Sequence, residues 1–235
     1  MYHYFMVYVI IFAGGVGSRM HASKPKQFLD INGKPILAHT LSIFNNNDNV
    51  DRIIVVSGAD YINTVKQLVH DFNLSKVVKI VSGGKTAIES QFNGIKEAVI
   101  SSDCSNDIVL IHDGVRPFID NELINRCIDE VKKKGTAITV SPAAETIAIT
   151  EGGAIKETAP REKCLIARAP QCFYLKDIYN SHLLAQKQGK TYVDSASMLL
   201  DQGKILNPVF GPDKNIKITT PYDYELAKLL LGDKK

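Results

Sequence analysis

The sequence is poor in cysteine and carries little excess charge of either sign. Its four cysteines lie far apart and form neither a C-x-x-C pair nor a cysteine–histidine set with the spacing of a zinc site. We therefore expect reduced thiols in a cytoplasmic protein. The 28 basic and 25 acidic residues leave a net charge of +3, which is too small to indicate nucleic acid as a partner.

Long hydrophobic runs and internal repeats are also missing. The apolar start, 1–13, is too short to span a bilayer, and it has neither the basic region nor the cleavage site of a signal peptide. With 235 residues, of which 45% are hydrophobic and 23% charged, the chain can form one sizeable core. We expect a single domain, 1–235, that does not interact with membranes.

The glycine-rich loop at 14–17 matches neither of two common nucleotide-binding motifs. A dinucleotide fingerprint requires glycine three places after Gly17, where Met20 stands, and we expect no Gly-Lys-Ser/Thr of a Walker A motif near any strand end. A dehydrogenase also needs an acidic residue at the end of its second strand, where this chain has Ser57 and Gly58. These absences argue against an NAD-dependent dehydrogenase and against a P-loop at this position.

The same loop nevertheless favours an anionic ligand. It follows an apolar run, 7–13, that is typical of a buried strand, so its glycine amides should lie at the carboxyl edge of a sheet. Arg19 and Lys26 add positive charge with no carboxylate nearby in the sequence. We therefore predict a triphosphate site and a nucleotide substrate. A loop that merely connects a strand to a helix is the alternative.

Segments of β type alternate with helix-like segments along most of the chain. This alternation predicts an α/β, Rossmann-like fold, with a mostly parallel twisted sheet flanked by helices. The expected strands cover 7–13, 52–57, 77–81, 107–112 and 137–140, and the expected helices cover 36–44, 61–72, 87–101 and 123–134.

The pattern changes at 143–173 to short β-like pieces interrupted by glycine and proline. This segment is too small to bury its own core, so we expect a β-arm that projects from the sheet rather than a separate domain. The exposed edges of such an arm are most simply satisfied by a second copy of the chain, and we therefore predict a two-fold homodimer.

Several further segments, in this order, give the chain a resemblance to a known family. After FAGGVGSRM at 12–20 they are KPKQF (24–28), GKPILAHT (33–40), GG (83–84), HDGVRPF (112–118), APQCF (169–173) and NIKITTPYD (215–223). In their order and spacing the chain resembles the cytidylyltransferases that activate polyol phosphates, namely the methylerythritol-phosphate and ribitol-5-phosphate enzymes. The resemblance implies transfer of CMP from CTP to a polyol (alditol) phosphate with release of pyrophosphate, in cell-wall, capsule or isoprenoid biosynthesis.

The implied reaction needs no covalent protein nucleophile, because a phosphate oxygen of the acceptor attacks the α-phosphorus of CTP. Catalysis then depends on positioning and on neutralisation of charge. Arg19 and Lys26 are the first catalytic candidates, and the resemblance adds Lys217. Asp113 ends an expected strand at the same sheet edge, where one carboxylate beside a triphosphate suffices to hold Mg²⁺. A ribose contact or a turn cap is the alternative for Asp113, and we expect His112 to be structural.

The resemblance also implies the remaining contacts. The arm should place Arg161 and Thr146 over the active site of the neighbouring subunit, with Arg161 on the acceptor phosphate. The nucleotide is assigned to Ala13, Gly14, Gly15, Gly17, Gly83, Ser90 and Asp113, and the acceptor to Arg116, Thr146 and Arg161.

Three positions depart from the family pattern. Ala87 stands where arginine is frequent, and Ala169 and Val193 replace threonines. Lys85 offers a charge in place of the missing arginine, although not its bidentate geometry. The two lost hydroxyls favour ribitol 5-phosphate, and methylerythritol phosphate stays the main alternative. A noncatalytic nucleotide-binding protein is the alternative of another class, against which the retained basic and acidic candidates argue.

Overall fold

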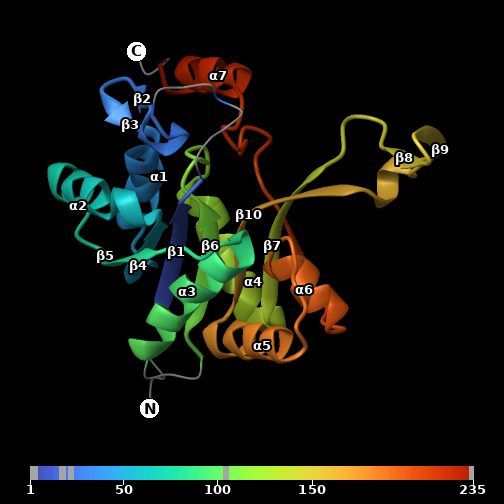
Figure 1. Ribbon diagram of the computed structural model, residues 1–235, viewed down its shortest axis with the longest axis horizontal. Coiled ribbons are helices and arrows are strands. Elements are labelled where there is room, and N and C mark those ends of the chain that lie inside the picture. Colours follow the sequence, from blue (N-terminus) through green and yellow to red (C-terminus); the bar gives the residue numbers. More distant parts are fainter. Residues whose placement is uncertain (1–4, 16–19, 21–23, 103–105, 233–235) are drawn as a thin grey trace.

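A seven-stranded sheet forms the centre of the molecule in the computed structural model, which describes residues 5–15, 20, 24–102 and 106–232 (Figure 1). Parallel pairs join β1 to β4 and β6, β4 to β5, and β7 to β11, whereas β10 is antiparallel to both β6 and β7. The predicted mostly parallel α/β sheet is therefore confirmed. In spatial order the strands are β11 (Pro208–Phe210), β7 (Thr136–Pro142), β10 (Leu165–Tyr174), β6 (Ile108–Asp113), β1 (Val7–Ala13), β4 (Arg52–Ser57) and β5 (Val77–Ser82).

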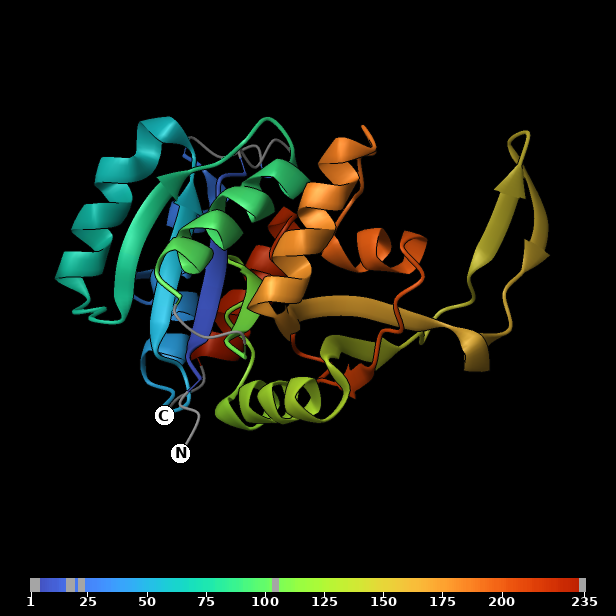
Figure 2. The same ribbon diagram turned by 90° about the horizontal axis from the view of Figure 1, so that it is seen from below.

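Strand β1 shows why this sheet is covered on both sides. Its residues are apolar without interruption, and successive side chains point to opposite faces. Val9 and Ile11 belong to one core cluster, and Tyr8 and Ile10 belong to another. The first cluster includes residues of α1 (Ile36–Asn45), α2 (Ile62–Asp71) and α4 (Asn121–Lys134), and the second includes residues of α3 (Ala87–Ile100), α5 (Leu175–Lys187) and α6 (Ser195–Asp201). Figure 2 shows α4 and α5 on opposite sides of β10.

Local sequence signals define where several helices begin and end. Thr86 accepts a hydrogen bond from the Glu89 amide at the start of α3, and Asp120 does the same for the Leu123 amide at the start of α4. Helix α4 ends at Gly135, whose φ of 84° suits glycine. These caps define where α3 and α4 begin and where α4 ends.

A smaller layer covers one end of the sheet. The hairpin of β2 (Asp30–Ile31) and β3 (Lys34–Pro35) lies beside α7 (Pro221–Gly232), and Ile31 and Ala227 belong to a third buried cluster. Helices α5, α6 and α7 and strand β11 were not among the predicted elements. None of the helices in the described ranges combines the length and the apolar character needed to cross a membrane.

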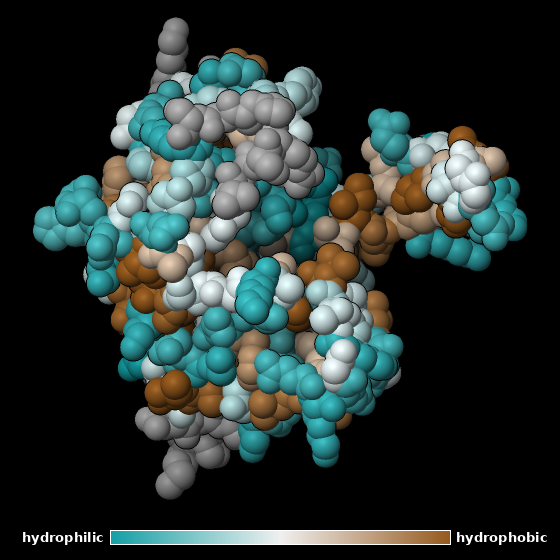
Figure 3. Space-filling model, viewed as in Figure 1, coloured by the Kyte–Doolittle hydropathy of each residue, from teal (hydrophilic) through white to brown (hydrophobic). Residues whose placement is uncertain are grey.

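A two-stranded arm, β8 (Ala148–Glu151) and β9 (Ala154–Thr158), projects from the body (Figures 1 and 2). The predicted boundary at 173 is wrong, because Gln171 and Phe173 pair with β6 and β7 inside the main sheet. The prolines and glycines suggested separate short pieces, whereas β10 runs from the arm into the sheet as one strand with a register shift. Figure 3 shows apolar surface on the arm and near its base, where exposed side chains include Ile147, Ile149, Ile155, Leu165 and Ile166.

Candidate active site

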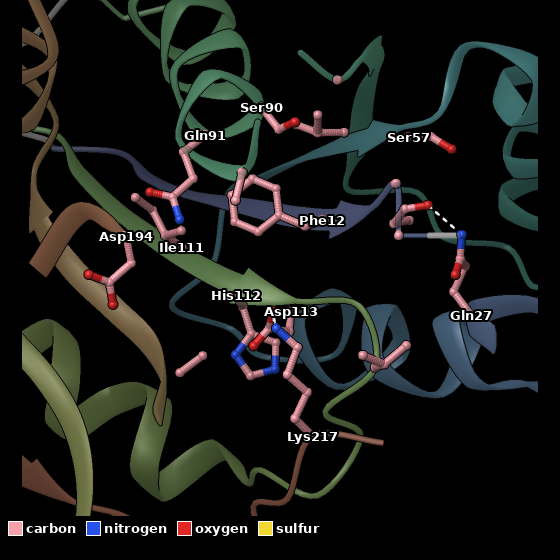
Figure 4. A pocket seen from close by; sticks show the side chains of 18 of the residues that line it. Phe12, Gln27, Ser57, Ser90, Gln91, Ile111, His112, Asp113, Asp194 and Lys217 are labelled. Carbon is pink, nitrogen blue, oxygen red and sulfur yellow. Dashed lines mark hydrogen bonds and ion pairs between the residues drawn. The ribbon is translucent and has the colours of Figure 1, made fainter. Parts of the chain in front are cut away.

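A cavity of about 780 Å³ lies at the carboxyl ends of the parallel strands (Figure 4). Ala13 of β1, Ser57 of β4, Ser82 of β5 and Asp113 of β6 all line it. Parallel strands bring their carboxyl ends to one edge of a sheet, and that edge is where open α/β folds bind ligands. Gly14 and Gly15, the described part of the glycine loop, share this edge with Asp113, as the sequence predicts.

The glycine loop and the turn after it bring bare backbone and a lysine to this cavity. Gly14 and Gly15 line it, and a Cβ on Gly14 would lie 3.6 Å from the Gly58 amide nitrogen. Lys26 is buried in the short 3-10 turn Lys26–Phe28 and also lines the cavity. Gln27, which sequence reasoning missed, donates from Nε2 to the Ala13 carbonyl at 2.7 Å and fixes the end of β1 (Figure 4). The predicted Gly17 and Arg19 lie outside the described residues.

Asp113 is the centre of a charged cluster. Its Oδ2 accepts from Arg116 Nε and its Oδ1 from Lys217 Nζ, each at 2.7 Å. Burial opposes ionisation of this carboxyl, but the charges and hydrogen bonds of Lys217 and Arg116 outweigh it and lower the pKa of Asp113 to about 2. The carboxylate is therefore ionised at neutral pH, and it holds Lys217 in the cavity.

The main chain of Asn215 organises the cations around this cluster. Its carbonyl accepts from Arg116 Nη1 at 3.0 Å and from Arg168 Nη1 at 2.7 Å. The fully buried Asn215 side chain donates to the Ala169 carbonyl at 2.7 Å, which ties this segment to β10. Arg168 also lines the cavity. Sequence reasoning did not select Arg168, although it directly precedes the quoted APQCF segment.

His112 has the contacts of a structural residue. Its ring is buried, lies edge-on to Phe44 with centroids 5.0 Å apart, and places Nε2 3.1 Å from the Arg116 carbonyl oxygen. Burial lowers the pKa of His112 to about 4, so the ring is neutral at physiological pH. A neutral ring that donates from Nε2 supports the turn that carries Arg116.

The loop after β5 packs closely on the first turn of α3. A Cβ on Gly83 would lie 2.9 Å from Ser90 Oγ, and Ser90 Oγ accepts from the Gly84 amide at 3.0 Å. Gly83 and Ser90 thus meet at the cavity wall, as their joint assignment to the nucleotide requires. The expectation that no Gly-Lys-Ser/Thr lies near a strand end is wrong, because Gly-Lys-Thr at 84–86 closely follows β5. A Walker A motif is still absent there, because Lys79 stands where its first glycine would be.

Polar residues that sequence reasoning missed form the far end of the cavity. Gln171 of β10 donates from Nε2 to Asp194 Oδ2 at 2.9 Å, and Asp194 caps α6. Gln91 of α3 and Val193 line the same cavity. Gln171 lies within the APQCF segment and Gln91 directly follows Ser90. Only this closeness to residues and segments that resemble the family could have pointed to the two glutamines from the sequence.

Thr146 and Arg161 lie together on the arm. Arg161 Nη2 donates to Thr146 Oγ1 at 3.4 Å, and both residues are exposed. Neither is among the described residues that line the cavity of the same chain. The structure therefore brings these two predicted residues to each other and not to Lys26, Asp113 and Lys217.

The donor set of the cavity is compatible with Mg²⁺ only when ligand oxygens complete the coordination. No group of three or more histidine, cysteine, aspartate or glutamate side chains suited to a metal ion occurs among the residues that the structure describes. Asp113 and Asp194 are the carboxylates that line the cavity in this part of the chain. Magnesium is often held by one or two carboxylates together with phosphate oxygens and water, so Asp113 beside a triphosphate fits this ion.

Comparisons with known proteins agree with this geometry. Residues 7–233 match the family model described as IspD, 2-C-methyl-D-erythritol 4-phosphate cytidylyltransferase. A ribitol-5-phosphate cytidylyltransferase of Streptococcus agalactiae serotype Ia is 44% identical over 94% of this chain and 93% of its own. A 2-C-methyl-D-erythritol 4-phosphate cytidylyltransferase of Halalkalibacterium halodurans is 37% identical over 97% of each chain. The solved 4-diphosphocytidyl-2C-methyl-D-erythritol synthase of Anaerococcus prevotii superposes with a TM-score of 0.83 at 27% identity, covering 97% of this chain and 96% of its own.

Proposed function

Because the chain belongs to the IspD family of cytidylyltransferases, we propose that it transfers CMP from CTP to ribitol 5-phosphate. The products are the CDP-alditol and pyrophosphate. The observation that carries this proposal is a cavity at the carboxyl edge of the sheet where Lys26 and Lys217 accompany the glycine loop. Ribitol 5-phosphate is favoured over methylerythritol phosphate because a relative of the first kind is 44% identical to this chain and a relative of the second kind 39%.

In the proposed reaction an oxygen of the acceptor phosphate forms a bond to the α-phosphorus of CTP. The bond from that phosphorus to the bridging oxygen breaks, and pyrophosphate leaves with the electron pair. The acceptor oxygen is already ionised, so no protein base is needed. Lys26 neutralises charge beside the glycine loop, and Lys217 does so from the segment after β11 that lines the same cavity, where Asp113 fixes its Nζ. Arg19 is proposed for the same role as Lys26.

Mg²⁺ is part of the proposal. When bound, the ion would neutralise negative charge on the triphosphate, and Asp113 is the residue proposed to hold it. Arg116 and Lys217 already contact the two oxygens of that carboxylate. Their contacts orient Asp113 and keep it ionised.

The arm supports a homodimer with composite sites. Arg161 and Thr146 lie outside the cavity of their own chain, and exposed isoleucines accompany them on the arm. We propose that Arg161 of one subunit contacts the acceptor phosphate in the other. The buried Cys127 and Cys172 form no disulfide, which accords with the cytoplasmic location that we propose.

Measurement of pyrophosphate release tests the proposed function directly. CTP is incubated with ribitol 5-phosphate, methylerythritol phosphate and other alditol phosphates in parallel, and the CDP-linked product is identified by mass. We expect the highest kcat/KM with ribitol 5-phosphate. A higher value with methylerythritol phosphate would reassign the acceptor, and CTP binding without turnover of any acceptor would favour the noncatalytic nucleotide-binding protein.

A further inference from the structure

The N-terminal part of α3 presents two consecutive polar side chains to the cavity, Ser90 and Gln91. Neighbouring residues of an α-helix point about 100° apart, so the two face different parts of the site. Ser90 is hydrogen-bonded to the Gly84 amide in the loop assigned to the nucleotide. Gln91 is hydrogen-bonded to Ser195, the neighbour of Asp194, and Figure 4 shows it on the side of the cavity where Asp194 lies.

A buried chain of contacts fixes the Gln91 side chain, which is 7% exposed. Ser195 Oγ donates to Gln91 Oε1 at 2.5 Å, and His182 Nε2 lies 3.4 Å from the same Oγ. The Ser195 proton points to Gln91, so Ser195 can only accept from His182, which assigns the ring proton to Nε2. The His182 ring in turn stacks on Phe92, with centroids 5.3 Å apart and an interplanar angle of 11°.

This chain of contacts uses the oxygen of Gln91 and leaves its amide nitrogen for the cavity. Within the described ranges, no residue accepts a hydrogen bond from Gln91 Nε2. The nitrogen points into the cavity in Figure 4. Burial lowers the pKa of His182 to about 4, so the neutral donor form of the ring persists at physiological pH.

We infer that Gln91 is a specificity-determining residue, whose Nε2 donates a hydrogen bond to a hydroxyl of the acceptor polyol. This inference rests on the proposed function, because it names how the same cavity recognises its acceptor. A hydroxyl both donates and accepts, and the Asp194 carboxylate in the same part of the cavity is an acceptor for its proton. A donor and an acceptor placed together favour a hydroxyl over a methyl group, because the methyl group would leave both unpaired.

The nearby departures from the family pattern agree with this role. Ala169 and Val193 line the cavity without a hydroxyl. In this part of the cavity, Gln91 and Asp194 then supply the polar groups that can contact the acceptor hydroxyls. Ser195 and His182 are positioning residues in this scheme, because they act through Gln91 and do not line the cavity.

The sharpest test replaces Gln91 by glutamate. Gln91→Glu keeps an oxygen that accepts from Ser195 but puts a second oxygen where the donor was. We expect kcat/KM for ribitol 5-phosphate to fall about tenfold or more, mainly through KM of the acceptor, while KM of CTP changes less than about twofold. Gln91→Met removes both polar atoms and should shift KM in the same direction. Gln186→Met, on the exposed face of α5, is the matched control and should match wild type.

Further measurements separate this inference from the proposed function. Ser195→Ala should raise the acceptor KM by a smaller factor and leave KM of CTP unchanged, which a general loss of structure would not do. If the wild type uses only another alditol phosphate, the proposed acceptor is wrong and the same KM comparison is made with that acceptor. If the wild type turns over none, calorimetric titration with ribitol 5-phosphate replaces kinetics. Folded Gln91 variants with an unchanged acceptor KM or Kd, or a wild type that binds no alditol phosphate, would overturn the inference.

Discussion

Lys217 Nζ lies 2.7 Å from Asp113 Oδ1, and this ion pair joins positions 104 residues apart in the sequence. Arg116 occupies the other oxygen of the same carboxylate. One acidic side chain at the end of β6 thus holds two cations in the cavity wall. Because Asp113 is ionised throughout the physiological range, the arrangement does not depend on pH there.

Lys26 should matter more for turnover than for nucleotide affinity. In the proposed site the glycine amides bind phosphate, so the charge of Lys26 is available to stabilise the crowded transition state. Lys26→Ala should lower kcat at least about a hundredfold, with a smaller change in the Kd of CTP. Lys66→Ala, at an exposed position of α2, is the control. Near-normal turnover of the Lys26 variant would remove this lysine from the mechanism.

Activity should require a divalent cation held in part by Asp113. EDTA should abolish pyrophosphate release, and added Mg²⁺ should restore it. Asp113→Asn should raise the Mg²⁺ concentration for half-maximal rate about tenfold or more, because the ligand loses its charge. Asp177→Asn, in the exposed first turn of α5, should leave that concentration unchanged. Full activity in excess chelator would contradict the requirement.

Two inactive variants should complement each other if the sites are composite. Arg161→Ala lacks the arm residue, and Lys26→Ala lacks the cavity residue. After subunit exchange, some heterodimers should contain one intact site, so that part of the activity returns. Sedimentation measures the dimer and the assay measures the recovery. An active monomer, or no recovery after demonstrated exchange, would refute the arrangement.

Stability should fall in mild acid because His112 is buried in its neutral form. Its pKa is about 4 in the folded chain, against an ordinary value of 6.5. As pH falls below 6.5, the unfolded chain binds the His112 proton before the folded chain does. The contribution of neutral His112 to the free energy of unfolding is therefore fully present above pH 6.5 and is lost progressively as pH falls to 4. The slope is roughly 1 kcal/mol per pH unit for one such group.

Urea unfolding at several pH values between 7 and 4.5 tests this expectation. His112→Gln retains a side-chain NH for the Arg116 carbonyl but does not titrate, so its unfolding free energy should depend less on pH. Burial also lowers the pKa of His182 to about 4, so the unfolding free energy of His112→Gln should still fall somewhat with falling pH. His70→Gln, at an exposed site, should behave as wild type. An identical slope in the His112 and wild-type proteins would contradict the assignment.

Gly114→Ala should damage both stability and the site. Its Cβ would lie 2.6 Å from the Phe12 carbonyl oxygen and 2.9 Å from Leu37 Cδ1. The backbone next to Asp113 must move to relieve this contact, at a cost of about 1–3 kcal/mol. The melting temperature and kcat of Gly114→Ala should both be lower than those of the wild type. Gly232→Ala, whose Cβ would lie 3.8 Å from Asn32 Nδ2, is the control. Equal melting temperatures of Gly114→Ala and wild type would show that the close approach is harmless.

Local sequence patterns predicted the alternation of strands and helices and the sheet edge at which the cavity lies. Strand β1 was predicted with its observed bounds because a continuous apolar run is a local signal, and α4 was predicted within two residues because its end at Gly135 is local too. The glycine loop and Asp113 were placed together because both follow strands, and parallel strands share one edge.

Tertiary structure decided the rest. That β10 enters the sheet between β6 and β7 is a matter of pairing between distant segments, which no local pattern encodes. The same pairing places Arg168 beside the Asn215 carbonyl and Gln171 beside Asp194. Gln91 looked like any polar residue of an amphipathic helix. Only the packing of α3 against α5 and α6 turned its oxygen to Ser195 and its nitrogen to the cavity, because a side-chain amide is oriented by the partners that the fold brings to it.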